Sequence, residues 1–163
     1  MEHRETLLTI AELAVALAGF ASLVSVIGGR PNDASRVSAS LRLRAMLEIA
    51  LRNAAFALLP LPFLQFAPSD PVVWRISSGV YVAATAGHFL LRLRSTDPPG
   101  ESWHSVSNRI LFSITVLVGL ANVFGFGGSN AFSLYLANLL LGLGAAGLSF
   151  ISVATSVFGS EHE

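Results

Sequence analysis

The segment from Ile110 to Ser160 contains no charged residue. At ~1.5 Å of rise per residue, one helix of these 51 residues would be roughly 75 Å long, more than twice the ~30 Å hydrocarbon core of a bilayer. The segment must therefore fold back once, and the Gly-rich string from Phe124 to Asn130 marks the reversal. The sequence predicts two membrane-spanning helices joined by a short turn.

The composition of the whole chain agrees with this prediction. Hydrophobic residues make up 53% of the 163 residues and charged residues only 12%, against about a quarter in a soluble domain. We therefore expect residues 1–163 to form a single integral membrane domain, with the lipid bilayer as a partner. The chain has no cysteine, which excludes disulfides, and its net charge of zero argues against binding of nucleic acid.

Apolar segment lengths predict an all-α, polytopic transmembrane bundle of five spans. The expected spans are residues 6–27, 41–66, 72–91, 110–124 and 131–158. The loops between them are short, so neighbouring spans should pack antiparallel. Pro60 and Pro62 cannot donate backbone hydrogen bonds, and they should kink or fray the second span near its end.

The start of the second span has two interpretations. Arg42, Arg44, Glu48 and Arg52 either form an amphipathic interfacial helix on lipid headgroups, which leaves four spans, or belong to the end of one long tilted helix. We favour the second interpretation, in which the Arg side chains extend to water. Glu48 and Arg52 have the i, i+4 spacing of a helix ion pair.

The first span is expected to stay in the mature protein. A cleaved signal peptide has a basic start and an apolar stretch of about 7–15 residues, whereas this chain starts with the net acidic MEHRET and its apolar stretch is longer and contains Glu12. The span has a pattern that is common in small bacterial membrane proteins.

The distribution of Arg predicts the orientation in a cytoplasmic (inner) membrane. Eight of the ten basic residues lie in or beside the loop after the first span and the loop after the third, and these loops share one side when five spans alternate. These eight are Arg30, Arg36, Arg42, Arg44, Arg52, Arg92, Arg94 and Arg109. The positive-inside rule then puts the N-terminus outside and the C-terminus inside.

Polar residues at membrane depth are the candidate functional residues. A charged group at a helix centre costs about 2.5–3.5 kcal/mol, so it tends to face protein or a water-filled cavity. By helix rise, Glu12, Asn122 and Asn138 from three spans share one layer, and Tyr135 is one turn from Asn138. The layer is either an ion pathway for cations or protons, or a set of hydrogen bonds that holds helices together.

The histidines are weaker candidates for functional residues than the polar residues at membrane depth. His88 lies one turn before Arg92 and is a candidate pH-sensitive group, although a single His near a helix end is more often a structural hydrogen-bonding residue. His3, His104 and His162 have no metal-ligand spacing. We expect no metal and no cofactor.

Gly125-Phe126-Gly127 resembles part of the potassium-channel filter. The filter threonine is missing, and the preceding apolar segment is long enough to cross the membrane, whereas a filter needs a half-depth pore helix. A tight Gly turn explains the string better, because Gly tolerates the positive φ of such a reversal.

Small residues at helical spacing allow close helix packing in membranes. Ala14, Ala18 and Ala21 form one such face in the first span, and Gly142 and Ala145 belong to another in the last. Packing within one chain easily accounts for one small-residue face. Because the chain has several such faces, we expect it to form a homo-oligomer.

No catalytic motif is present, so an enzyme is the least favoured function class. The preferred hypothesis is a small homo-oligomeric channel or transporter for cations or protons, with Glu12 in the pathway. The alternative is a non-catalytic accessory or scaffold subunit whose polar residues only join helices. An oligomer mass would separate these hypotheses, because one five-helix bundle leaves little room for a pore.

Overall fold

The computed structural model describes residues 2–27, 33–66, 71–94 and 104–158. Its regular elements are all helical within these ranges, which confirms the all-α prediction. Five helices are long: α1 (Glu2–Ile27), α2 (Asp33–Leu58), α4 (Pro71–Arg94), α5 (His104–Val123) and α6 (Ala131–Phe158). Two are short: α3 (Leu61–Leu64) and the 3-10 turn η1 (Gly128–Asn130).

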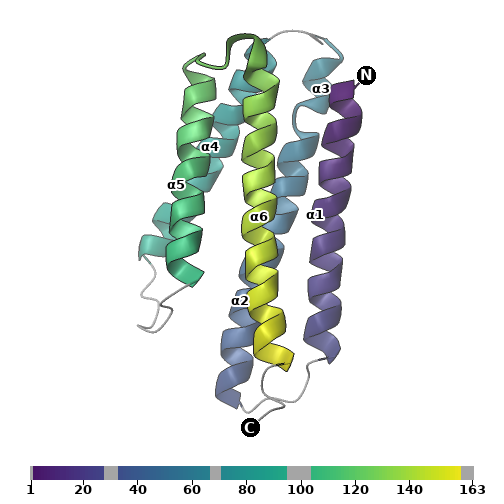
Figure 1. The fold of residues 1–163 in the computed structure, drawn as a ribbon, viewed down its shortest axis with the longest axis vertical. Coiled ribbons are helices and arrows are strands. Elements are labelled where there is room, and N and C mark those ends of the chain that lie inside the picture. Colours follow the sequence, from purple (N-terminus) through teal and green to yellow (C-terminus); the bar gives the residue numbers. More distant parts are fainter. Residues whose placement is uncertain (1, 28–32, 67–70, 95–103, 159–163) are drawn as a thin grey trace.

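The long helices form an elongated bundle in which successive helices run in opposite directions (Figure 1). Helix α6 is central, because it contacts α1 and α2 on one side and α4 and α5 on the other. The start of α1 and the α5–α6 turn lie at the same end of the bundle, which we call the turn end (Figure 1).

Three described segments are long and apolar enough to cross a membrane: His3–Val24, Met46–Leu64 and Gly128–Ile151. The apolar part of α5, Ile110–Val123, is shorter, and α4 lacks the required apolarity. Arg75 and His88 lower the hydropathy of α4 most, and Ser77, Ser78 and Thr85, which are buried inside the bundle, lower it slightly further. Three membrane-length segments are therefore present, where five spans were predicted.

The bounds of α2 and α6 can be compared with the predicted spans. Helix α6 has the predicted bounds, whereas α2 begins earlier than expected and ends at Leu58. Pro60 then starts the short helix α3, as expected from prolines that cannot continue a hydrogen-bonded helix. Because α2 is one continuous helix from Asp33, the structure contains no separate interfacial helix within it.

The α5–α6 reversal is a glycine turn, as predicted. Gly125 has φ +84° and Gly128 has φ +49°. The Phe126 N–H donates to the Ala121 carbonyl (3.0 Å) and the Gly125 N–H to the Asn122 carbonyl (3.0 Å), which together form a Schellman motif with glycine at its left-handed position. The Ala121 and Asn122 carbonyls at the end of α5 thus accept hydrogen bonds from the turn that follows.

The small residues of α1 pack inside the molecule. Ala14, Ala18 and Ala21 are buried, and Ala18 meets Ala50 of α2 and Ala146 of α6 in a contact of three alanines. This close packing holds α1 against the rest of the bundle. The small face of the first span is therefore used within one chain and is not free for a subunit contact.

Candidate functional site

The main polar feature is a buried cluster formed by Asn53 of α2, Tyr81 of α4 and Asn138 of α6, which we call the central cluster. All three side chains are at most 3% exposed. The Tyr81 hydroxyl donates to Asn53 Oδ1 (3.1 Å) and lies 3.3 Å from the Asn138 carbonyl oxygen. Asn53 Nδ2 donates to the Leu139 carbonyl (2.8 Å). The cluster therefore joins α2, α4 and α6.

The side chain of Asn138 extends the central cluster to a fourth helix. We assign its amide the orientation in which Nδ2 donates to the Thr115 carbonyl (2.9 Å) and Oδ1 accepts from the Gly119 N–H (3.2 Å). Thr115 and Gly119 are four residues apart on α5, so this amide lies against one helical turn of that helix. Both of its polar groups are satisfied, as a buried amide requires.

Two glycines make room for the central cluster. A Cβ at Gly142 would lie 2.4 Å from Asn53 Oδ1 and 2.6 Å from the Tyr81 hydroxyl. A Cβ at Gly119 would lie 2.9 Å from the side-chain amide of Asn138 and 2.2 Å from a Val82 methyl carbon. Gly142, predicted as a helix-packing residue, is therefore needed by the polar cluster itself. Ala145, predicted with it, is only half-buried.

A second polar group, the turn cluster, consists of Asn122 of α5 and Ser78 of α4. Asn122 Nδ2 donates to Ser78 Oγ (2.8 Å) and to the Ala131 carbonyl (2.9 Å). Its Oδ1 is buried without a hydrogen-bond partner and lies 2.8 Å from where a Cβ of Gly127 would be. Ala131 and Asn138 are seven residues apart, or ~10 Å along α6. The predicted single layer is therefore two levels.

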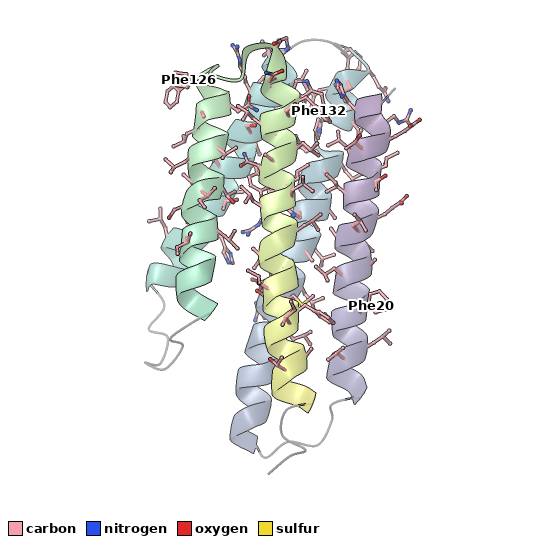
Figure 2. All side chains as sticks on the ribbon, in the orientation of Figure 1. Phe20, Phe126 and Phe132 are labelled. Carbon is pink, nitrogen blue, oxygen red and sulfur yellow. The ribbon has the colours of Figure 1, made fainter. Side chains whose placement is uncertain are left out.

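Tyr135 lies near the turn end, between the two sides of the bundle. It is fully buried, and its hydroxyl donates to the Phe56 carbonyl of α2. Its ring belongs to an aromatic group with Trp74 and Phe132, on which the ring of His3 stacks at a centroid distance of 3.9 Å from Phe132. Figure 2 shows Phe132 between α6 and α1, whereas Phe126 points away from the bundle.

Glu12 lies apart from both clusters. Its side chain is exposed on α1, whereas the residue before it in sequence, Ala11, is buried. Helix geometry explains the difference, because one residue is a rotation of about 100° around the axis. The expectation that Glu12 shares one layer with Asn122 and Asn138 is therefore wrong for the single chain. Glu12 is exposed, and the two buried asparagines lie at two different levels of the bundle.

The charged residues of α2 pair differently from the prediction. Glu48 Oε1 accepts from Arg44 Nε (2.9 Å) on the exposed surface, so its partner in this pair is one turn before it rather than Arg52. Such an exposed pair contributes little to stability. Arg52 and His88 are half-buried, and the side chain of Arg42 lies outside the described residues.

Asn53, Tyr81 and Ser78 are the site residues that the sequence analysis did not identify. Ser78, Tyr81 and Thr85 follow one another at i, i+3 and i+7, so a polar face on α4 is visible in the sequence. Asn53 is adjacent to Arg52, and the charged residues before it indicated the end of a membrane span. For that reason the sequence analysis did not assign Asn53 to the interior.

Comparison with protein-family models, curated proteins and solved structures finds no match. In the described part of the chain, no three His, Cys, Asp or Glu side chains are grouped as metal ligands would be. The fold and the two clusters therefore define the class of the protein: an all-helical bundle with membrane-length apolar segments and a polar, hydrogen-bonded interior.

Proposed function

We propose that the protein is a non-catalytic subunit embedded in a cytoplasmic membrane, and that the central cluster holds its helices together rather than lining a path for ions. All five long helices cross the bilayer in this proposal, including α4 and α5. The observation that carries the proposal is the hydrogen bonding of Asn53, Tyr81 and Asn138 to one another and to backbone groups.

The chemistry of the clusters supports this role. Side chains that line an aqueous path exchange hydrogen bonds with water, whereas Asn53 and Asn138 use both ends of their amides on other parts of the protein. Between membrane helices, polar side chains of this kind contribute to association where the hydrophobic effect does not. The four helices joined in this way form a closed interior.

The arrangement of the helices is compatible with the proposed orientation. Helices α1, α4 and α6 begin at the turn end, and α2 and α5 end there (Figure 1). Arg44 lies on α2 just before the apolar segment Met46–Leu64, whereas Arg52 lies inside that segment, next to Asn53 of the central cluster. We propose that the turn end faces outward and the opposite, Arg-rich end faces the cytoplasm.

A second candidate function is a path for cations or protons between several copies of the chain. The position of Glu12 favours it, because an exposed carboxyl group on α1 would line a space between subunits. This path would lie outside the bundle, so it does not use the central cluster.

Cation flux into proteoliposomes tests the two candidates. The subunit proposal predicts the same flux as in protein-free liposomes, for the natural chain and for Glu12→Gln alike. A flux in the natural chain that falls in Glu12→Gln, with the fold and the native mass unchanged, would overturn it in favour of the path between copies. Gln keeps the size of the side chain and its hydrogen-bonding groups but removes the charge.

A further inference from the structure

The outward surface of α1 carries polar and small residues along its centre. They recur at alternating spacings of four and three residues, and all are exposed: Glu5, Thr9, Glu12, Ala16 and Gly19. We call this set the α1 line. Large apolar side chains flank it, with Leu13 55% and Phe20 62% exposed on one side and Val15 54% exposed on the other. Figure 2 shows Phe20 pointing away from the bundle.

Lipid is an unfavourable neighbour for the α1 line. Glu12 lies nine residues into the apolar segment His3–Val24, ~14 Å along its axis and close to the middle. Its carboxyl group has no hydrogen-bond or ion-pair partner in the described part of the chain. A carboxyl group at this depth is strongly disfavoured in hydrocarbon unless it faces protein or water. Another protein helix over the α1 line would take this carboxyl group out of contact with hydrocarbon.

The bundle itself makes no use of the small residues in the α1 line. A Cβ at Gly19 would have no atom of the protein within 4 Å, in contrast to the glycines of the central cluster. Ala18, one residue earlier, already provides the close contact to α2 and α6. Ala16 and Gly19 are thus small residues between larger exposed side chains, a pattern that allows a second helix backbone to approach closely.

We propose that a second copy of this chain covers the α1 line, with the two α1 helices parallel about a two-fold axis normal to the membrane. This inference deepens the proposed function and rests on its membrane placement. In such a pair, residues of the same number meet. The two Glu12 side chains then lie at the same level and face each other instead of lipid.

Charge complementarity at the turn end also favours a second copy. Arg4 and Glu5 are both exposed, carry opposite charges and are adjacent in sequence. In a parallel pair, Arg4 of one copy lies at the level of Glu5 of the other, so two ion pairs form symmetrically. An antiparallel contact would separate these groups by the length of the helix and is excluded for two copies with the same membrane orientation.

Cysteine cross-linking of the full chain in membranes tests the proposal, since the natural chain has no cysteine. Ala16→Cys should form a disulfide-linked dimer under mild oxidation. Leu117→Cys, 66% exposed on α5, is the matched control and should remain monomeric. Equal cross-linking of the two variants, or none at Ala16→Cys, would overturn the proposal, as would a linked product with the mass of a different protein.

A second substitution in the Ala16→Cys background sharpens the result. Gly19→Leu should lower the dimer yield several-fold, because it separates the backbones without touching the bundle. Gly144→Leu is the matched control, since Gly144 also has no atom within 4 Å of a Cβ but lies on α6, and it should leave the yield unchanged. The opposite pattern would place the contact on α6 and contradict the proposal. Because cross-linking does not depend on ion flux, it can fail or succeed independently of the proposed function.

Discussion

The Tyr81 hydroxyl of α4 donates to Asn53 Oδ1 of α2 over 3.1 Å, which links two helices that lie on opposite sides of α6. Gly142 of α6 lies against both groups and has no side chain to separate them. The amide, the phenol and the glycine therefore depend on one another, and the following predictions test that dependence.

Gly142→Ala should destabilise the bundle by about 1–3 kcal/mol, as expected when a methyl group is forced into a packed interior. The added carbon would lie 2.4 Å from Asn53 Oδ1, so the Asn53–Tyr81 bond must shift or break. Unfolding in detergent, followed by circular dichroism, measures the loss. Gly144→Ala is the control on the same helix, with open space at its Cβ, and should be neutral or stabilising by up to ~1 kcal/mol.

Asn138→Leu should destabilise helix packing by roughly 0.5–2 kcal/mol, since it removes the hydrogen bonds between α6 and α5 at Thr115 and Gly119. The same unfolding assay measures it, with Leu140→Ala on the exposed side of α6 as control. A loss in Asn138→Leu no larger than in the control would mean that the amide does not join the helices.

Ala18→Leu should destabilise the single chain by about 1–3 kcal/mol, because Ala50 and Ala146 leave no room for a larger side chain. Ala16→Leu, two residues earlier on the exposed side, should leave the unfolding midpoint of the monomer unchanged. If Ala18→Leu altered only the native mass and left the fold intact, the three-alanine contact would not be the one that holds α1.

A reporter fused after Glu163 should be active on the cytoplasmic side. The expectation rests on the five alternating helices and on the sequence pattern, in which eight of the ten Arg residues fall in or beside two loops predicted to share one side. A phosphatase, active only outside, and a fluorescent protein, active only inside, give opposite readings for the same fusion site. Activity of the phosphatase fusion would reverse the proposed orientation.

The features that could be predicted from the sequence are those set by local chemistry. The charge-free segment and its glycines predicted α6 and the turn, because glycine alone accepts φ values such as the +84° of Gly125 without strain. The sequence indicated that Asn122 and Asn138 lie at membrane depth, where they were candidates for an ion pathway or for hydrogen bonds between helices. The structure places both in the interior, 0% exposed.

The features that could not be predicted depend on which way each helix is turned. Helix rise gives the depth of Glu12 but not its direction, and the direction is set by Ala11, Ala14 and Ala18 packing inside. Once these alanines are known to form the buried face of α1, helix geometry puts Glu12 on the exposed face. Asn53 and Tyr81 meet over 28 residues of sequence, and no local pattern predicts such a pairing.

The closed interior is the central claim, and the reactivity of Ser78→Cys with a membrane-impermeant, water-borne thiol reagent tests it most directly. Ser78 is fully buried and accepts a hydrogen bond from Asn122, and a sulfur in place of its hydroxyl oxygen is a small change. Ser129→Cys, exposed in the turn, is the positive control. We predict rapid labelling of Ser129→Cys and none of Ser78→Cys in the folded protein in liposomes. Labelling of Ser78→Cys at a comparable rate would show that water reaches the polar interior and would contradict the account.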